Sequence, residues 1–502
     1  MRLLVNRGMT ALALMVLASA CAGSVDQSTT TSARQPTPPQ STTVVRIPGP
    51  LSESVMLSPA MDVERVIASA PAGTAFIFEP GTYRNVSIEP KNSMSFVGQP
   101  GATLNGSTVL EGFTQQGSVW ILAGINAEGR VQGNCKEVAL MCSRPEDVYI
   151  NSVLSQQIED ANDVGPGTFQ LNYDTGVLTV GDDPAGQIVE LTTTEFAFFG
   201  TASDVTIDGF IIEKYANPAQ SGAIQAKSGN TLALRWRIAN NDVRFNHGVG
   251  IKLGAQNVAE QNRVYANGQL GIGTGPGGFD NIIRDNEVYG NTTIGFLPGF
   301  ETGGMKLTTQ TRLLVERNYV YDNAGPGIWT DIDNIDVTIA ENVVENNLGP
   351  GIFHEISYRA VIKDNTVTGN GFGWTQWLYG AGILIAHSPD VEVTGNVVRD
   401  NRLGIIGIQQ DRGTGAYGER ELRNLYVHDN IIVASEGSSG IGQDIGSEAV
   451  FSEWNNRFES NTYYVNANEY FRWLGKVLDF NTWNSFGNDL EGQTFEIDAF
   501  DP

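Results

Sequence analysis

The chain has 502 residues, of which 58 are glycine. This glycine share of about 12 %, where about 7 % is usual, indicates many tight turns and argues against long helical bundles. The 56 acidic and 31 basic residues give a net charge of −25, which repels phosphate backbones and argues against nucleic-acid partners.

The N-terminus has the pattern of an export signal. Arg2 and Arg7 supply positive charge, residues 11–17 form an apolar run, and small residues fill 18–20. We therefore assign 1–20 to a signal peptide that directs the protein to the bacterial cell envelope or beyond. Cys21 follows the predicted cleavage site and completes a lipobox-like pattern, so export ends either in lipid attachment at Cys21 or in simple secretion. Membrane contact is expected only through such an anchor.

A linker and the first folded elements come next. Ser, Thr, Pro and Gln dominate this part of the chain, so we assign 21–45 to a linker with too little apolar surface to fold. Apolar residues at helical spacing predict a short capping helix within 61–70, and a turn-flanked strand follows at 76–78. We place the N-terminal cap and the first coils at 46–111.

The strongest pattern is an internal repeat, Asn-x-Val-x-x-Asn. Its seven copies are 21, 24, 32, 24, 23 and 31 residues apart and begin at Asn241, Asn262, Asn286, Asn318, Asn342, Asn365 and Asn396. Such a period is typical of a solenoid, and short β segments joined by Gly and Asn turns predict a parallel β-helix. The repeated Asn side chains are expected to stack along its axis. We expect a right-handed coil, because parallel β crossovers are right-handed.

A segment before the repeats breaks this rhythm. Apolar runs at 119–122, 148–150, 168–171 and 177–180 are separated by turns and predict antiparallel strands. We assign 112–190 to an inserted β domain. Within it, Cys135 and Cys142 are expected to form a disulfide rather than a metal site, because the chain is exported and no pair of His residues lies nearby.

Together these patterns predict an all-β fold class. It is a right-handed parallel β-helix solenoid with an inserted small antiparallel β domain and a short N-terminal capping helix. The main β-helix is placed at 191–462 and a C-terminal cap at 463–502.

Two acidic residues occupy the same position in neighbouring repeats. Asp331 lies 13 residues after Asn318, and Glu355 lies 13 residues after Asn342. Adjacent coils would place the two carboxyl groups about 5 Å apart. Retaining glycosidases hold their carboxyl pair at about 5–5.5 Å, whereas inverting enzymes need about 6.5–9.5 Å. The spacing favours retention, while a solvated surface pair or a Ca²⁺ ion held between coils are the non-catalytic alternatives.

Aromatic and polar residues flank the acid pair and suit a sugar, whose CH faces pack on rings while its hydroxyls bond polar groups. Trp329 is expected to form the floor of the sugar site, and His354 to orient a carboxylate or hydroxyl. The substrate-binding candidates are Trp329, His354, Lys306, Asp333, Trp374, Trp377 and Tyr379.

The acid pair lies in two segments that resemble the paired signature of glycoside hydrolase family 120, whose members act as β-xylosidases. They are Gly327-Ile328-Trp329-Thr330-Asp331 and Phe353-His354-Glu355-Ile356-Ser357. The segments at 145–150 and 165–169 likewise resemble the β-sandwich that those enzymes insert into an early coil. The resemblance implies that Asp331 is the nucleophile, that Glu355 is the acid/base and that no cofactor or metal is needed. The wider likeness is to pectate-lyase-like β-helices.

The sequence therefore leaves three functions open. The first is an exported glycoside hydrolase that acts on a plant or microbial polysaccharide or oligosaccharide with two carboxylates. The second is a polysaccharide lyase or epimerase that acts on polyuronate with Lys306 as base, for which Lys252 and Arg317 are further candidates. The third is a non-catalytic cell-surface protein that binds glycan.

Overall fold

The computed structural model describes residues 54–127, 130–434, 437–466 and 469–500. The predicted signal peptide at 1–20, the linker at 21–45 and the lipidation candidate Cys21 lie outside the described residues. Within the described residues, no helix combines the length and the apolar character that crossing a bilayer requires.

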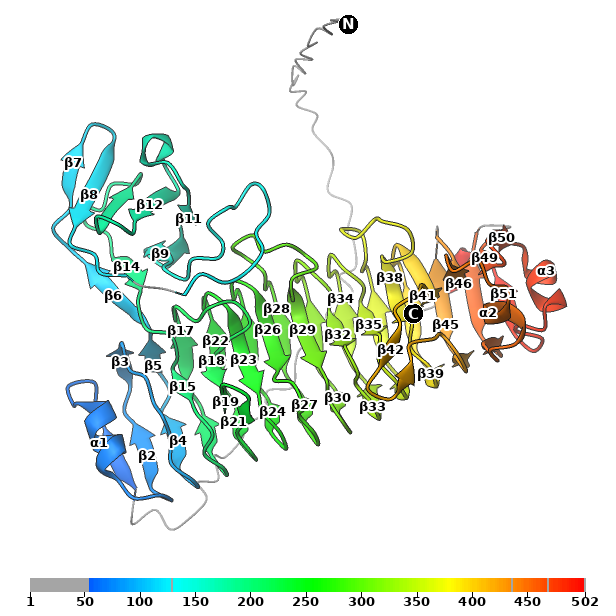
Figure 1. Ribbon diagram of the computed structural model, residues 1–502, viewed down its shortest axis with the longest axis horizontal. Helices are drawn as coiled ribbons and strands as arrows, with labels where there is room; N and C mark the ends of the chain where they lie inside the picture. Colours follow the sequence, from blue (N-terminus) through cyan, green and yellow to red (C-terminus); the bar gives the residue numbers. More distant parts are fainter. Residues whose placement is uncertain (1–53, 128–129, 435–436, 467–468, 501–502) are drawn as a thin grey trace, which may run out of the picture. The chain divides into compact units, whose positions relative to one another are not determined.

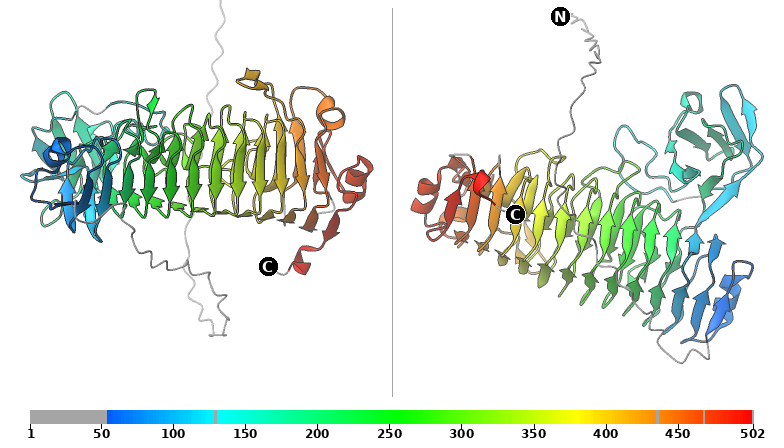
Figure 2. Two further views of the ribbon diagram at one scale, coloured as in Figure 1. Left: turned by 90° about the horizontal axis from the view of Figure 1, so that it is seen from below. Right: turned by 180° about the vertical axis from the view of Figure 1, so that it is seen from behind.

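Three long sheets of parallel strands run side by side around a common axis (Figures 1 and 2). In the described part of the chain, one sheet has 13 strands, from β1 (Val55–Leu57) to β47 (Arg457–Glu459). Another 13-stranded sheet runs from β3 (Gly81–Arg84) to β51 (Gln493–Phe495). Successive coils contribute one strand to each sheet, which is the predicted solenoid.

The third sheet positions the candidate site and is called the site sheet below. Its neighbours pair in parallel, except at the final pair of strands. In order, its described strands are β15 (Phe198–Phe199), β18 (Gly222–Gln225), β23 (Val249–Leu253), β26 (Leu270–Thr274), β29 (Gly303–Thr308), β32 (Ile328–Asp331), β35 (Ile352–Glu355), β38 (Ala381–Ala386), β41 (Leu403–Gln409), β46 (Ser439–Gln443), β49 (Phe471–Trp473) and β50 (Lys476–Leu478).

The core lies inside the coil, where one apolar side chain of each strand meets its equivalents above and below. On the site sheet, Ile272, Met305, Ile328, Ile352 and Ile383 stand in register on successive strands and are all fully buried. Each such side chain contributes about 1.5–3 kcal/mol through its burial. Because strand side chains alternate, the residues between these positions face outward and are available to a site.

The repeated asparagines form the predicted ladder. The Asn241 side-chain amide donates to Asn262 Oδ1 at 3.0 Å, and the same bond continues through Asn286, Asn318, Asn342, Asn365 and Asn396 at 2.9–3.0 Å. The second asparagine of each repeat makes a parallel ladder of its own. These bonds satisfy buried turn groups and fix the register between coils.

A separate group of strands leaves the coil after β5 (Ala102–Asn105) and returns before β15 (Figure 1). Two small sheets contain the described strands from β6 (Ser107–Leu110) to β14 (Val189–Thr192), with mainly antiparallel pairing. The four predicted strands are present as β8 (Val119–Ala123), β9 (Val148–Ile150), β12 (Thr168–Asn172) and β13 (Val177–Val180).

A loop of this inserted region returns to the coil. Cys135 and Cys142 are joined by a disulfide. Cys135 pairs in an antiparallel bridge with Phe296, and the Leu297 amide donates to the Asn134 carbonyl at 2.8 Å. The disulfide loop therefore lies against a coil insertion of the site sheet.

Helices lie near the two ends of the coil (Figure 1). Helix α1 (Val63–Ser69) buries two side chains of its inner face, and α2 (Ala449–Ser452) is a single turn. Helix α3 (Phe480–Ser485) buries Trp483, whose ring lies 5.4 Å from that of Trp473. These aromatic contacts cover the last coils.

Candidate active site

The two acids stand side by side on neighbouring strands of the site sheet. Asp331 ends β32 and Glu355 ends β35, and the parallel register pairs them directly. Strands in a sheet are about 4.7–4.9 Å apart, so the backbone sets the separation of the two side-chain origins. Both side chains belong to the outward-facing set of their strands, because Thr330 and His354 just before them are fully buried inside the coil.

Each acid has a basic partner of its own. Lys306 Nζ, on the preceding strand β29, lies 2.9 Å from Asp331 Oδ2. Arg412 Nη1, which follows β41, lies 2.8 Å from Glu355 Oε1. The second oxygen of Asp331, Oδ1, is buried and has no hydrogen-bond partner among the described residues. The pair is thus charge-compensated while one carboxylate oxygen is left unbonded.

Burial and mutual repulsion oppose ionisation of both acids. Burial raises the pKa of Glu355, the adjacent Asp331 raises it further, and Arg412 acts in the opposite direction. Burial also raises the pKa of Asp331, against the lowering effect of Lys306. Both environments therefore oppose ionisation, and the charge on one acid disfavours a charge on the other, as in other catalytic carboxyl pairs.

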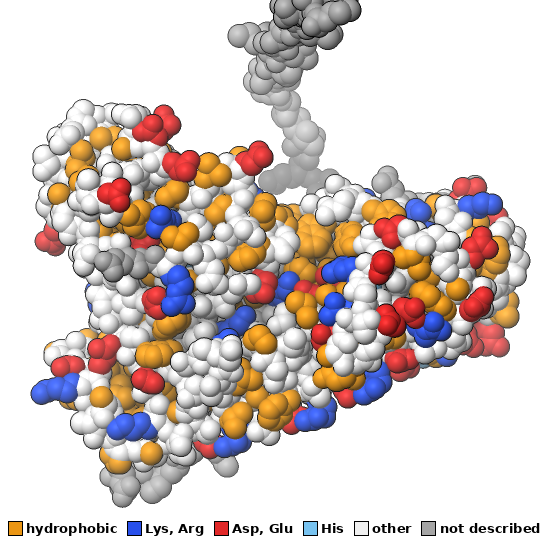
Figure 3. All heavy atoms as spheres, in the orientation of Figure 1, with side chains coloured by type: hydrophobic (Ala, Val, Ile, Leu, Met, Phe, Trp, Pro, Cys, Tyr) orange, Lys and Arg blue, Asp and Glu red, His pale blue; other side chains and the backbone are white. Residues whose placement is uncertain are grey.

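A groove of about 590 Å³ lies over the pair. Figure 3 shows a hollow over the middle of the coil, with hydrophobic side chains along it and acidic and basic side chains close together beside it. The groove combines the two acids and their basic partners with aromatic rings and side-chain amides. Its lining side chains include Lys306, Trp329, Asp331, Phe353, Glu355, Trp374, Gln376, Tyr379, Arg412, Phe300 and Asn134.

Loops build the walls of this groove, and the loop after β41 supplies Arg412. Asn134 comes from the disulfide loop of the inserted region, and 297–300 come from the coil insertion that pairs with it. Trp374, Gln376 and Tyr379 come from the loop between β37 (Thr366–Thr368) and β38. The acids therefore lie on the rigid sheet, while the surroundings that a ligand would meet come from loops.

Trp329 does not provide the open ring face that was expected of a sugar floor. Lys306 Nζ lies 3.5 Å from the centroid of one ring face, and Phe353 stacks on the other with centroids 5.3 Å apart. Both neighbours share the register position of Trp329 on adjacent strands. The indole lines the groove with both of its ring faces contacted, and its buried Nε1 has no partner among the described residues.

The prediction that His354 binds substrate is wrong. Its ring points into the coil, where Nδ1 lies 2.8 Å from Thr330 Oγ1 and Nε2 lies 3.1 Å from the Tyr358 carbonyl. Burial lowers its pKa to about 4, so it is neutral at physiological pH. The physical reason is strand alternation, because the residue before an outward-facing Glu355 must face inward.

Asp333 and Trp377 were also predicted to bind substrate, but neither lines the groove. Asp333 stands in the turn after β32, where Oδ1 is 3.0 Å from Arg420 Nη2. Trp377 shares its loop with Trp374 but is 40 % exposed. Their predicted neighbours Trp374 and Tyr379 do line the groove, and the Trp374 indole Nε1 is buried without a partner among the described residues.

Sequence reasoning missed several groove residues. Phe353 stands one repeat after Trp329, so the offset that located the acids would also have found it. Asn134, Gln376 and Arg412 lie in loops outside the repeat, and no spacing predicts where such residues meet.

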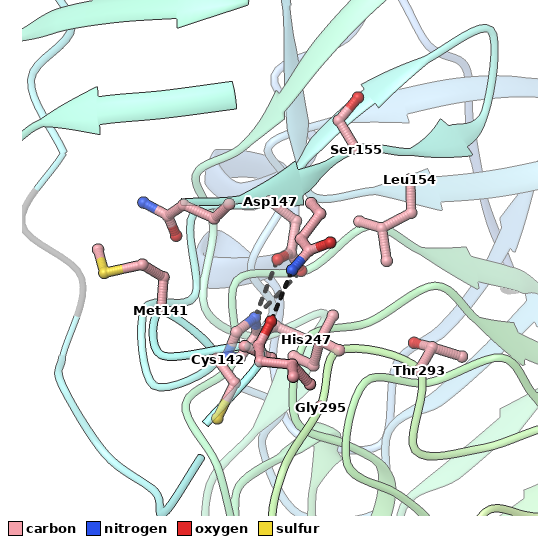
Figure 4. Close-up of a pocket in the computed structure, with 13 residues that line it drawn as sticks. Met141, Cys142, Asp147, Leu154, Ser155, His247, Thr293 and Gly295 are labelled. Atoms are coloured by element: carbon pink, nitrogen blue, oxygen red, sulfur yellow. Dashed lines mark hydrogen bonds and ion pairs between the residues drawn. The ribbon is translucent and has the colours of Figure 1, made fainter. Parts of the chain in front are cut away.

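The disulfide loop also borders a second cavity of about 370 Å³, shown in Figure 4. Asp147 and His247 both line it and are buried, with His247 Nδ1 3.1 Å from Asp147 Oδ2. Cys142 and Gly295 line it as well. Among the described residues, no group of three or more His, Cys, Asp or Glu side chains is arranged to hold a metal ion.

Comparison with known proteins establishes the fold. Residues 221–398 match a family model described as a right-handed β-helix region. The structure of XylC with xylose superposes with a TM-score of 0.66 at 15 % identity and covers 88 % of this chain and 83 % of that one. The chain is a right-handed parallel β-helix protein. The β-helix also resembles the A-module of the Azotobacter vinelandii mannuronan C-5 epimerase AlgE6, with a TM-score of 0.50, 12 % identity and coverage of 86 % and 92 %. No curated protein sequence matches this chain.

Proposed function

We propose that this protein is an exported glycoside hydrolase that cleaves a polysaccharide or oligosaccharide by a retaining mechanism, with Asp331 as nucleophile and Glu355 as acid/base. The observation that carries the proposal is the in-register pair of buried acids in an aromatic groove, with Asp331 Oδ2 held by Lys306 and Oδ1 left without a partner among the described residues. The fold that the chain shares with XylC, which was solved with xylose, and the motif resemblance support it.

In the first step, the Asp331 carboxylate attacks the anomeric carbon while the glycosidic C–O bond breaks. Glu355 gives its proton to the departing oxygen, so the aglycone leaves as an alcohol and the sugar remains esterified to Asp331. Lys306 binds Asp331 Oδ2, which orients the nucleophile and limits its rotation. Burial and the adjacent Asp331 raise the pKa of Glu355, which favours its protonated form before the step.

In the second step, the ionised Glu355 takes a proton from a water molecule, whose oxygen attacks the anomeric carbon. The bond to Asp331 breaks, the carboxylate returns, and the product has the anomeric configuration of the substrate. The Trp374 and Tyr379 rings line the groove and suit the CH faces of a sugar, while the buried Trp329 and Trp374 indole N–H groups have no partner among the described residues. No step needs a cofactor.

The proposal is tested with aryl glycosides of xylose, arabinose, fucose and galactose. We expect turnover of at least one of them, and NMR of the fresh product should show the anomer of the substrate. An inverted product would contradict the predicted acid separation, and no turnover of these or of natural glycans by the wild type would remove the proposal.

The lyase or epimerase alternative requires Lys306 to take a proton from a polyuronate substrate. Lys306 Nζ lies 2.9 Å from Asp331 Oδ2 and 3.5 Å from the centroid of the Trp329 ring, so both contacts compete with a substrate for this group. Incubation with polyuronates separates the two chemistries, because a lyase releases an unsaturated product that absorbs in the near ultraviolet. The glycan-binding alternative predicts that ligand affinity survives while no bond is cleaved.

A further inference from the structure

A short hairpin follows β41 and lies outside the three long sheets (Figure 1, β42). It consists of β42 (Thr414–Gly415) and β43 (Gly418–Glu419), paired antiparallel. An arginine stands on each side of it, Arg412 before β42 and Arg420 after β43. Residues 411–420 are called the arginine hairpin below.

Both arginines reach back to the coils that carry the acids. Arg412 Nη1 is 2.8 Å from Glu355 Oε1, and Arg420 Nη2 is 3.0 Å from Asp333 Oδ1. Asp333 stands two residues after Asp331, in the turn that follows β32. The hairpin therefore spans from its own coil to the coils of both acids.

Tyr358 is a second anchor. It stands three residues after Glu355 and is buried, its hydroxyl donates to the Gly418 carbonyl at 2.7 Å, and the Tyr417 ring packs edge-on against it at 5.3 Å. At the base of the hairpin, the Gln409 side-chain amide donates to the Gln410 carbonyl at 2.7 Å, and its oxygen accepts from the Leu422 amide.

The Arg420–Asp333 contact differs from the exposed Asp–Arg pairs of the coil. Asp336–Arg359 joins adjacent coils at the edge, and its two side chains are 42 % and 56 % exposed. The side chains of Arg420 and Asp333 are each 18 % exposed, and they are 87 residues apart in the chain. An exposed pair contributes little, whereas a pair with limited solvent access fixes geometry.

We propose that the arginine hairpin is a positioning element of the active site, in which Asp333 and Tyr358 act as positioning residues that hold the Arg412 guanidinium on the Glu355 carboxyl group. The inference rests on the proposed function and assigns a role to Asp333 that is different from substrate binding.

The chemistry of the second step explains what such an element would do. Glu355 must be ionised to take a proton from water, and Arg412 stabilises that ionised form. The charged and titratable groups around Glu355 are Asp331, Lys306, Arg412 and Tyr379. His387 and Asp444 interact in turn with Arg412 or Tyr379. Of these, Arg412 is the partner that contacts Glu355 directly and comes from a loop rather than from the sheet. Its removal raises the pKa of Glu355.

The test compares Arg412→Gln, Asp333→Asn, Tyr358→Phe and the double variant Asp333→Asn/Arg412→Gln, with Asp336→Asn as the matched control. Asparagine tolerates the left-handed backbone of Asp333, at φ 54°, so the single change keeps the turn. One readout is the pH profile of kcat/KM on an aryl glycoside that the wild type hydrolyses. The other, independent of activity, is the carboxyl titration of Glu355 followed by ¹³C NMR, with the signal assigned by its loss in Glu355→Gln.

We expect Arg412→Gln to move the alkaline limb of the profile and the NMR midpoint to higher pH. Asp333→Asn and Tyr358→Phe should move both in the same direction by less, with changes in kcat/KM of roughly two- to thirtyfold. The double variant should match Arg412→Gln alone, because Asp333 acts through Arg412, and Asp336→Asn should match the wild type.

The inference is overturned if both anchor variants titrate like the wild type, or if their effects add to that of Arg412→Gln. Should Asp333→Asn fail to fold, Tyr358→Phe and the NMR midpoint still decide the matter. If the wild type cleaves no glycoside, the proposed function fails by itself, and the NMR midpoints alone then support or overturn the role of the hairpin.

Discussion

Replacing Glu355 by glutamine is predicted to stabilise the fold at neutral pH, although the side chain lies at the centre of the groove. Two like charges about 5 Å apart repel by about 3 kcal/mol at an effective dielectric constant of about 20. The variant also gives up the ion pair with the partly exposed Arg412, which contributes up to about 1 kcal/mol. The net gain is therefore about 2 kcal/mol where both acids are ionised.

The pH dependence has a definite sign. The folded-state pKa of Glu355 is raised, so the unfolded chain releases this proton first as pH rises. The wild type therefore loses stability from the ordinary glutamate pKa up through the raised one, whereas the glutamine variant does not titrate there. The stability difference between the two should grow with pH over that window and level off above it.

The assay is thermal unfolding of the wild type and Glu355→Gln from about pH 4 to about pH 8, with the exposed Glu341→Gln as control. We expect the variant's midpoint to exceed that of the wild type increasingly as pH rises, while the control follows the wild type. A Glu355→Gln variant that is less stable at every pH, or whose difference is the same at every pH, would refute the reasoning about the acid pair.

Three further predictions concern the groove. Asp331→Ala should lower kcat/KM at least about 10³-fold with the circular dichroism spectrum unchanged, and a smaller loss would exclude a covalent role. Trp374→Phe keeps an aromatic ring but removes the indole N–H donor, so KM should rise about five- to tenfold with little change in kcat, as measured in steady-state kinetics. An unchanged KM would place that donor outside the ligand contacts. Replacing Cys135 and Cys142 by serine removes about 2.5 kcal/mol of loop constraint and should speed proteolysis within 134–142 and raise KM. Cleavage at the wild-type rate would show that pairing with 294–297 holds the loop by itself.

The spacing of the repeats predicted the positions of residues on the strands of the coil. A fixed offset from Asn318 and Asn342 placed Asp331 and Glu355 on neighbouring strands, because every coil repeats the same path. The same rule, used at one position less, would have shown that His354 faces the interior.

The spacing of the repeats could not predict the positions of residues in the loops. Arg412 contacts Glu355 across 57 residues and two further coils, and Asn134 arrives from an inserted region before the repeats begin. Their positions follow from loop contacts that have no periodicity. Trp329 was misjudged for another reason, since Lys306 and Phe353 cover its ring faces only because all three share one column.

The hydrogen-bonded pairing of β32 with β35 has a consequence for how such a site can change over time. Because ladder bonds fix the spacing of the two acids, substitutions in 134–142, 297–300 or 374–379 can reshape what enters the groove without altering the distance between Asp331 and Glu355. The spacing of the acid pair and the shape of the groove are thereby placed on separate structural parts, and diversification of those loops leaves the spacing intact.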